Sequence, residues 1–254
     1  MTKILIIPDC QVRADVNTKY LTHIGQYIVD KKPDIIINIG DFADMPSLSS
    51  YDKGKKSFEG RRYTKDIGAA RAGMIKLLAP MTAHNKSMEA GKRKKYRPEM
   101  ILTLGNHEDR ITRAINEDYV KLDGTISLDD LKYKEFGWTV VPFLKPIEIE
   151  GIMFCHYFYN PFSGKPYGGT VDNILKQLGK PFVQGHKQGL HVGTRAGRNY
   201  WGIICGSCYS HFEEFKGYQA NDHWRGIVML HNVSNGECDP MFISLDYLEK
   251  RYQI

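Results

Sequence analysis

The hydrophobic positions of the chain fall into short apolar runs that alternate with longer mixed stretches. Runs of branched aliphatic residues this short are typical of strands buried on both faces. They predict strands at residues 4–7, 35–37, 100–102, 152–154 and 182–183. Between them, apolar residues at helical spacing predict helices at residues 19–29, 66–78 and 171–178. This alternation indicates an α/β fold, and 254 residues suffice for one domain with a full core.

Polar side chains follow each of the five predicted strands. In chain order they are Asp9-Cys10-Gln11, Gly40-Asp41, Gly105-Asn106-His107-Glu108, His156 and Gly185-His186. In open α/β sheets ligands bind beyond the carboxyl ends of strands, so we expect these side chains to gather on one rim. Singly, each motif has a plain structural explanation, such as a turn or a helix cap. Together, the carboxylates, the amide and the imidazoles indicate a metal site.

This series resembles the signature of the calcineurin-like metallophosphoesterase superfamily, which reads D-x-H, G-D, G-N-H-[DE], H and G-H-x-H. The resemblance spans residues 9–188, and Gly-Asn-His-Glu at 105–108 is its most specific part. It implies a four-layer αββα sandwich with two divalent metal ions at the strand ends.

The resemblance also implies a role for each matched residue. Asp41 would bridge the two metals, and Asp9 would bind the first. The rest of the second metal's shell would be Asn106, His156 and His186. His107 corresponds to the catalytic histidine beside the leaving group.

The residues that follow His107 have expected roles of their own. Glu108 and Asp109 are placed to orient metal-bound imidazoles. Arg110 would either clamp a phosphate oxygen or be a solvated helix arginine.

The sequence departs from the superfamily signature at two positions that would both serve the first metal. Gln11 and Gln188 stand where the signature has histidine. Amide oxygens suit Mg²⁺ or Mn²⁺ better than Zn²⁺ or Cu²⁺. We therefore expect two divalent ions, Mn²⁺ first among Mg²⁺, Fe and Zn²⁺, with a weaker first site. His191 could replace an imidazole if its loop folds back, although Gly189-Leu190 favours the start of a returning strand.

The chemistry implied by the resemblance is hydrolysis of a phosphate ester. A metal-bridging hydroxide would attack phosphorus while His107 protonates the leaving oxygen. We expect a phosphodiesterase that acts on nucleic acid or a nucleotide. Two alternatives stay open: a phosphomonoesterase or nucleotide phosphatase, and a catalytically weak relative that binds nucleic acid or a protein partner.

Two basic stretches lie between Asp41 and Asn106. Residues 53–65 and residues 86–97 each hold six basic residues and one acidic residue, while the whole chain carries +6. Aromatic residues are interleaved with them, a pairing suited to backbone phosphates and stacked bases. We expect an inserted basic helical subdomain at 45–98, although a Lys/Arg run is often a solvated loop. The candidate nucleic-acid contacts are Lys55, Lys56, Arg61, Arg62, Lys92, Arg93, Lys94 and Lys95.

The remaining features bear on the compartment and on false motifs. Five scattered cysteines, the lack of a long apolar run and a strand at the N-terminus predict a cytoplasmic protein without a membrane partner. Cys205-Gly-Ser-Cys208 matches a cysteine-protease string but lies too late in the chain, so we expect two buried thiols. Asn235-Gly236 predicts a hairpin between residues 227–231 and 239–243.

Overall fold

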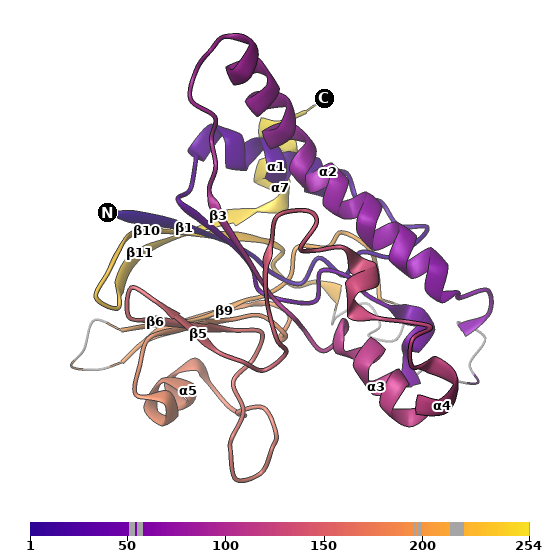
Figure 1. Cartoon of the computed structure of the whole chain (residues 1–254). Coiled ribbons are helices and arrows are strands. Elements are labelled where there is room, and N and C mark those ends of the chain that lie inside the picture. Colours follow the sequence, from indigo (N-terminus) through magenta and orange to yellow (C-terminus); the bar gives the residue numbers. More distant parts are fainter. Residues whose placement is uncertain (51–53, 55–57, 196, 198–199, 214–220, 254) are drawn as a thin grey trace.

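The computed structural model describes residues 1–50, 54, 58–195, 197, 200–213 and 221–253. These residues form a mixed α/β fold with two sheets, which confirms the expected α/β class (Figure 1). Within the described ranges, no helix combines the length and the apolar character needed to cross a membrane.

The larger sheet has six strands in the order β11-β10-β1-β2-β3-β4. Its parallel part is β1 (Thr2–Ile7), β2 (Ile35–Asn38), β3 (Glu99–Thr103) and β4 (Thr139–Val141). The predicted C-terminal hairpin, β10 (Gly226–Ser234) and β11 (Glu237–Ser244), is confirmed and pairs antiparallel with β1. Asn235 and Gly236 both have positive φ, as a tight hairpin turn requires.

The smaller sheet has five strands in the order β5-β6-β7-β9-β8. They are β5 (Ile147–Ile149), β6 (Ile152–Cys155), β7 (Phe182–Gln184), β8 (Leu190–Thr194) and β9 (Trp201–Cys205). Strands β6, β7 and β9 run parallel, so their carboxyl ends lie side by side at the same end of the sheet. The five predicted strands are all present, but they are divided between two sheets rather than gathered on the rim of one.

The alternation of side chains along β1 explains how the two sheets and the helices pack. Ile4 and Ile6 belong to a buried cluster that contains strand residues of both sheets. Leu5 and Ile7 face the other way, into a cluster shared with the helices α1 (Lys19–Lys31), α2 (Tyr63–Ala90) and α7 (Leu245–Arg251). A third cluster joins the smaller sheet to α5 (Val171–Leu178), which lies on the opposite side of the molecule from α1 and α2 (Figure 1).

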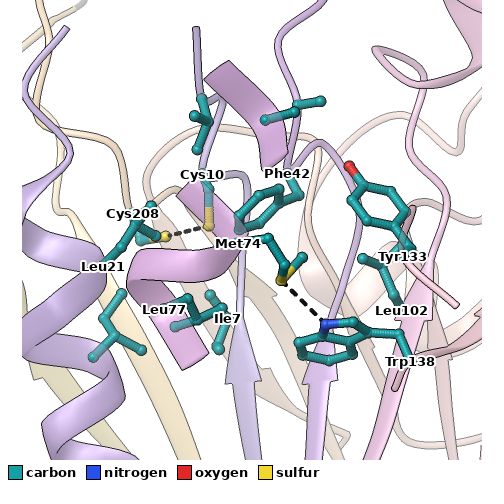
Figure 2. Packing of buried hydrophobic residues seen from close by; sticks show 14 of the residues in the cluster. Ile7, Cys10, Leu21, Phe42, Met74, Leu77, Leu102, Tyr133, Trp138 and Cys208 are labelled. Carbon is teal, nitrogen blue, oxygen red and sulfur yellow. Dashed lines mark hydrogen bonds between the residues drawn. The ribbon is translucent and has the colours of Figure 1, made fainter. Parts of the chain in front are cut away.

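The core under α2 contains two close contacts to sulfur (Figure 2). The indole Nε1 of Trp138 donates to Met74 Sδ at 3.1 Å, and Cys10 Sγ lies 3.2 Å from Cys208 Sγ. All five cysteines are free and buried, which confirms that Cys205 and Cys208 are buried thiols.

Helix α2 is longer than the sequence predicts. It continues through Pro80 to Ala90, a length of 28 residues or about 42 Å at ~1.5 Å per residue. Against α1 it packs so closely that a Cβ on Gly25 would lie 2.9 Å from the Pro80 ring. The 45–98 segment of the expected basic subdomain therefore contributes α2 to the main core.

The two ends of α2 lie near opposite ends of the strands of the larger sheet (Figure 1). Just before the helix, Arg61 donates to Pro46 O at 3.0 Å, and Pro46 follows the β2 carboxyl-end loop. Beyond the helix, the Tyr96 hydroxyl donates to Pro33 O at 2.6 Å, just before β2 begins. The described residues of the two basic stretches thus lie toward opposite ends of α2.

Candidate metal centre

Strand ends of both sheets converge on one group of polar side chains. Asp9, Asp41 and Asn106 follow β1, β2 and β3, while His156 and His186 follow β6 and β7. Asp9, Asp41 and His156 are almost fully buried, with exposed fractions of 1% or less. Residues far apart in the chain therefore meet between the carboxyl ends of the two sheets.

Four of these side chains point at a common centre. Asn106 Oδ1 lies 3.0 Å from His156 Nε2 and 2.8 Å from His186 Nδ1. Asp41 Oδ2 lies 3.3 Å from His156 Nε2. Ligand atoms on a six-coordinate ion at about 2.1 Å lie about 3.0 Å from one another, so these separations suit a small divalent cation. Asp41, His156 and His186 form a cluster able to hold a metal ion.

The donor chemistry of His156 supports a cation at this centre. Its Nδ1 lies 2.8 Å from Ile39 O, and a carbonyl can only accept, so Nδ1 carries a proton. In the neutral ring Nε2 then presents a lone pair to the oxygens of Asp41 and Asn106. Burial lowers the pKa of His156, but the charge of Asp41 overcomes it and raises the pKa to about 9. The field that holds this proton would equally favour a metal ion.

His186 is electrostatically different from His156. Burial and the neighbouring His156 lower the pKa of His186 to about 4. The ring is therefore neutral at pH 7, the form in which histidine binds metals. Tyr157 lies against it with ring centroids 4.6 Å apart.

Asp9 lies on the other side of Asp41 and is incompletely satisfied. Its Oδ1 accepts from the His186 amide at 3.2 Å, whereas its buried Oδ2 has no hydrogen-bond partner among the described residues. Burial, with a further contribution from Asp41, raises the pKa of Asp9 to about 7 although His156 opposes it. A second cation between Asp9 and Asp41 would satisfy the orphaned oxygen and relieve the repulsion of the two carboxylates.

The backbone around the cluster is strained. Asp9, Gln11, Asp41 and His186 all have positive φ, the left-handed region that costs other residues than glycine about 1–3 kcal/mol. Two glycines make room: a Cβ on Gly40 would lie 2.5 Å from His156 Nδ1, and one on Gly105 would collide with Asp41. Strain of this kind concentrates at functional sites, where the surrounding structure holds it.

Glu108 acts on the backbone of the cluster rather than on an imidazole. Its carboxylate accepts from the amides of Asp41, Ala43 and Gly105 at 2.9–3.0 Å, and from the Tyr133 hydroxyl at 3.2 Å. Burial and the charge of Asp41 raise the pKa of Glu108, against the pull of these amides. It thereby ties the loop after β2 to the loop after β3. Asp109, also expected to orient an imidazole, instead pairs with Arg113 at 3.4 Å.

His107 is held by Asp44 at the edge of the cluster. Its Nδ1 lies 2.7 Å from Asp44 Oδ1, so Nε2 faces Asp41 Oδ2, at 3.7 Å. Burial lowers the pKa of His107, but Asp41 and Asp44 outweigh it and raise the pKa. Arg110 donates to Asp44 O at 2.8 Å and reaches His107 Nε2 at 3.3 Å, so it is not the solvated arginine of the plainer expectation.

The remaining predicted residues lie around this centre or away from it. Gln11 is buried and its backbone N–H donates to Asp41 O at 2.8 Å. Gln188 is half-buried in the loop before β8. His191 lies within β8, as the returning strand predicted. Of the basic residues, Arg61 and Arg62 precede α2 near the cluster, and Lys92, Arg93, Lys94 and Lys95 lie beyond its far end. Lys55 and Lys56 lie outside the described residues.

Sequence reasoning missed an ionic network behind His107. Arg13 Nη1 lies 3.2 Å from Asp44 Oδ2 and 3.4 Å from Glu213 Oε1. Asp44 had a sequence signal, since it completes a G-D-x-x-D string, but Arg13 and Glu213 had none. Burial raises the pKa of Asp44. His107, Arg110 and Arg13 outweigh burial and lower this pKa to about 2.

The fold and the cluster together define a mixed α/β protein with a candidate centre for a divalent metal. The chain is 33% identical over 203 residues to the Gene 54 protein of Mycobacterium phage D29, covering 76% of this chain and 72% of that protein. It belongs to the same family as that phage protein.

The other comparisons add little. No family model matches the chain. Among solved structures it is similar to GAP50, the anchor in the inner membrane complex of Plasmodium, at 13% identity. That match has a TM-score of 0.33 and covers 99% of this chain and 87% of that chain, a similarity too low to carry an argument.

Proposed function

We propose that this protein is a divalent-metal-dependent phosphoesterase of the calcineurin-like metallophosphoesterase type, and that it hydrolyses a phosphodiester in nucleic acid or a nucleotide. On this proposal its two sheets and outer helices are the four-layer αββα sandwich of that superfamily. The observation that carries it is the convergence of Asp41, Asn106, His156 and His186 at ligand distances from four strand ends.

Two divalent cations in such a site would supply Lewis-acid polarisation of the phosphoryl group and a nucleophile from water. On this proposal Asp41 would contribute to both cation positions. Its Oδ2 lies 3.3 Å from His156 Nε2, and its charge raises the pKa of Asp9. Asp9 would hold the first position through its unpartnered Oδ2.

His107 supplies the proton chemistry on this proposal. Because Asp44 fixes Nδ1, Nε2 is the nitrogen that faces the cluster and can give a proton to the leaving oxygen. Asp44 and Asp41 raise the pKa of the ring, although Arg110 opposes them. A guanidinium only donates, so Arg110 would have to leave Nε2 before that nitrogen could carry the proton. Arg110, already within 3.3 Å of Nε2, would contact an oxygen of the same phosphate.

The test is hydrolysis of a bis-aryl phosphate diester and of the matching monoester by metal-stripped protein refilled with Mn²⁺. Asp41→Asn should lower kcat/KM at least about a thousandfold, because several kcal/mol of transition-state stabilisation depend on the two cations. Asp246→Asn, on the exposed face of α7, is the matched control and should retain full turnover.

Each outcome points to a different function. Diester turnover lost in Asp41→Asn supports the phosphodiesterase. A preference for the monoester would indicate a phosphatase. No turnover of either substrate with Mn²⁺, Mg²⁺, Fe²⁺ or Zn²⁺ would contradict the proposal and favour a binding protein that retains a metal site.

A further inference from the structure

A cleft of about 420 Å³ opens beside the candidate metal centre. One wall is the loop after β1, from Val12 to Thr18, and the other is the first half of α2, from Lys65 to Lys76. A volume of this size is within the range of ligand pockets. A cleft of this volume is too small to enclose a double helix.

The cleft is linked to the proposed acid histidine by a short chain of ionic contacts. Arg13 lines it, and Arg13 bonds Asp44, which in turn holds His107. Val12 anchors the same loop to the β2 carboxyl-end loop through Ala43. On this inference, a chain-like ligand with one phosphate at the metal centre would continue past Arg13 into the cleft.

The charge and the shape of the cleft suit a phosphate backbone. Its titratable lining residues are Arg13, Asp15, Lys65 and Lys76, a net charge of +2. Arg13 is already compensated by Asp44 and Glu213, so Lys65, Lys76 and Asp15 leave a net charge of +1 in the cleft. In the part of the chain that the structure describes, no carboxylate pairs with either of these two lysines. Lys76 donates one of its three hydrogens to Thr18 Oγ1 at 2.7 Å, which holds its ammonium over the cleft. Between the two lysines, the residues of α2 that line the cleft are small: Ala69, Ala72 and Gly73.

We propose that this cleft holds a single strand of nucleic acid on one side of the phosphodiester to be cleaved, with Lys65 and Lys76 on its phosphates. The inference rests on the proposed function for the cleavage and names its substrate class and path. It places substrate contacts on the near half of α2 and none on the far basic stretch at 86–97.

The first test measures binding without turnover. Fluorescence anisotropy of a labelled single-stranded 12-mer would be recorded in EDTA with the full chain and with Lys65→Glu/Lys76→Glu. The matched control Lys86→Glu/Lys250→Glu makes the same change in net charge on exposed residues elsewhere. We expect the Kd to rise at least about tenfold in the cleft variant and less than about twofold in the control. The slope of log Kd against log salt should fall by about 1.4, for two phosphates on a single strand.

The second test measures turnover with Mn²⁺. The cleft variant should lose kcat/KM on the oligonucleotide at least tenfold, mainly through KM, relative to its kcat/KM on the bis-aryl diester. Lys65→Arg/Lys76→Arg should recover most of the oligonucleotide activity, which separates charge from folding.

The outcomes distinguish this inference from the proposed function. Equal oligonucleotide binding by the cleft variant and the control would overturn the cleft while leaving any diester turnover in place. Loss of binding in the cleft variant without turnover of any ester would keep the cleft and overturn the phosphodiesterase. A duplex bound as tightly as the single strand, with the same dependence on Lys65 and Lys76, would overturn the single-strand assignment.

Discussion

The two halves of the candidate metal centre differ in how completely the protein prepares them. On one side, Asn106, His156 and His186 join Asp41 with ligand atoms about as far apart as they would be around an ion. On the other side, a buried oxygen of Asp9 has no partner among the described residues. On the proposed function, Gln11 and Gln188 would also stand there in place of two imidazoles. Both halves would share Asp41, so the contrast would arise from the remaining donors. A preformed site binds without reorganisation, whereas an incomplete one would depend on what a second ion and a substrate bring.

The largest difference should appear in metal affinity. His156→Ala should weaken Mn²⁺ binding at the prepared half at least about 100-fold, because it removes a ligand that Ile39 O holds in place. Gln188→Ala should change that affinity less than about threefold and affect only the weaker binding event. Isothermal titration calorimetry of the metal-stripped protein with Mn²⁺ resolves the two events. Equal losses in the two variants would mean that the halves are not distinct.

The ionic network that holds His107 beside the cluster should be visible in acid stability. Asp44 has its pKa lowered to about 2 in the folded protein, so its charged form contributes about 2 kcal/mol relative to an ordinary Asp. This stability is present above about pH 4 and is lost as the pH falls through about 2. Asp44→Asn should therefore reduce the free energy of unfolding at pH 7 by about that amount and by progressively less below pH 4. Urea unfolding at a series of pH values measures it, with Asp246→Asn as the control, and a difference independent of pH would argue against the ionic network.

Zn²⁺ affinity at the weaker half should rise when histidines are introduced at positions 11 and 188. Gln11→His/Gln188→His should raise Zn²⁺ affinity of the second binding event at least about tenfold, because imidazole suits Zn²⁺ better than an amide oxygen does. Competition with a chromogenic chelator measures the change, and Gln26→His on α1 controls for non-specific histidine binding. If the double variant binds Zn²⁺ no more tightly than the protein itself, Gln11 and Gln188 do not face a metal position.

The smallest effect is expected at the far end of α2. Lys92→Glu/Lys94→Glu should change turnover of a short single-stranded oligonucleotide less than about twofold, since this stretch lies about 40 Å along the helix from residue 63. Arg61→Glu/Arg62→Glu, at the near end, is the comparison and should reduce turnover more. An equal reduction by both variants would indicate that a long substrate spans the whole helix.

Much of this arrangement could be predicted from the sequence because it is local. Short apolar runs indicate strands buried on both faces. The glycines before Asp41, Asn106 and His186 mark places where another side chain of the cluster approaches the backbone closely. The parts that could not be predicted depend on contacts through space. Nothing near Arg13 in the chain indicates Glu213, its partner across 200 positions.

The position of the second basic stretch shows the same limit of local reasoning. Pro80 favours an early end of the helix, because proline removes a hydrogen bond and disturbs the preceding turn. Packing against α1 at Gly25 nevertheless carries α2 to Ala90. Because of these extra turns, residues 86–97 lie near the amino ends of the strands rather than near the carboxyl ends, where the candidate metal centre lies.

The pairing of β1 with β10 has a consequence for how the protein matures. Thr2 pairs with Val233, and Ile4 with Leu230, so one edge of β1 has no native neighbour until the ribosome has added more than two hundred further residues. Nascent chains therefore expose an unpaired aliphatic strand edge for tens of seconds at ordinary elongation rates of about 5–20 residues per second. Until β10 has been made, the chain cannot close the larger sheet behind Asp9. The candidate metal centre therefore depends on a segment that is synthesised long after its first residue.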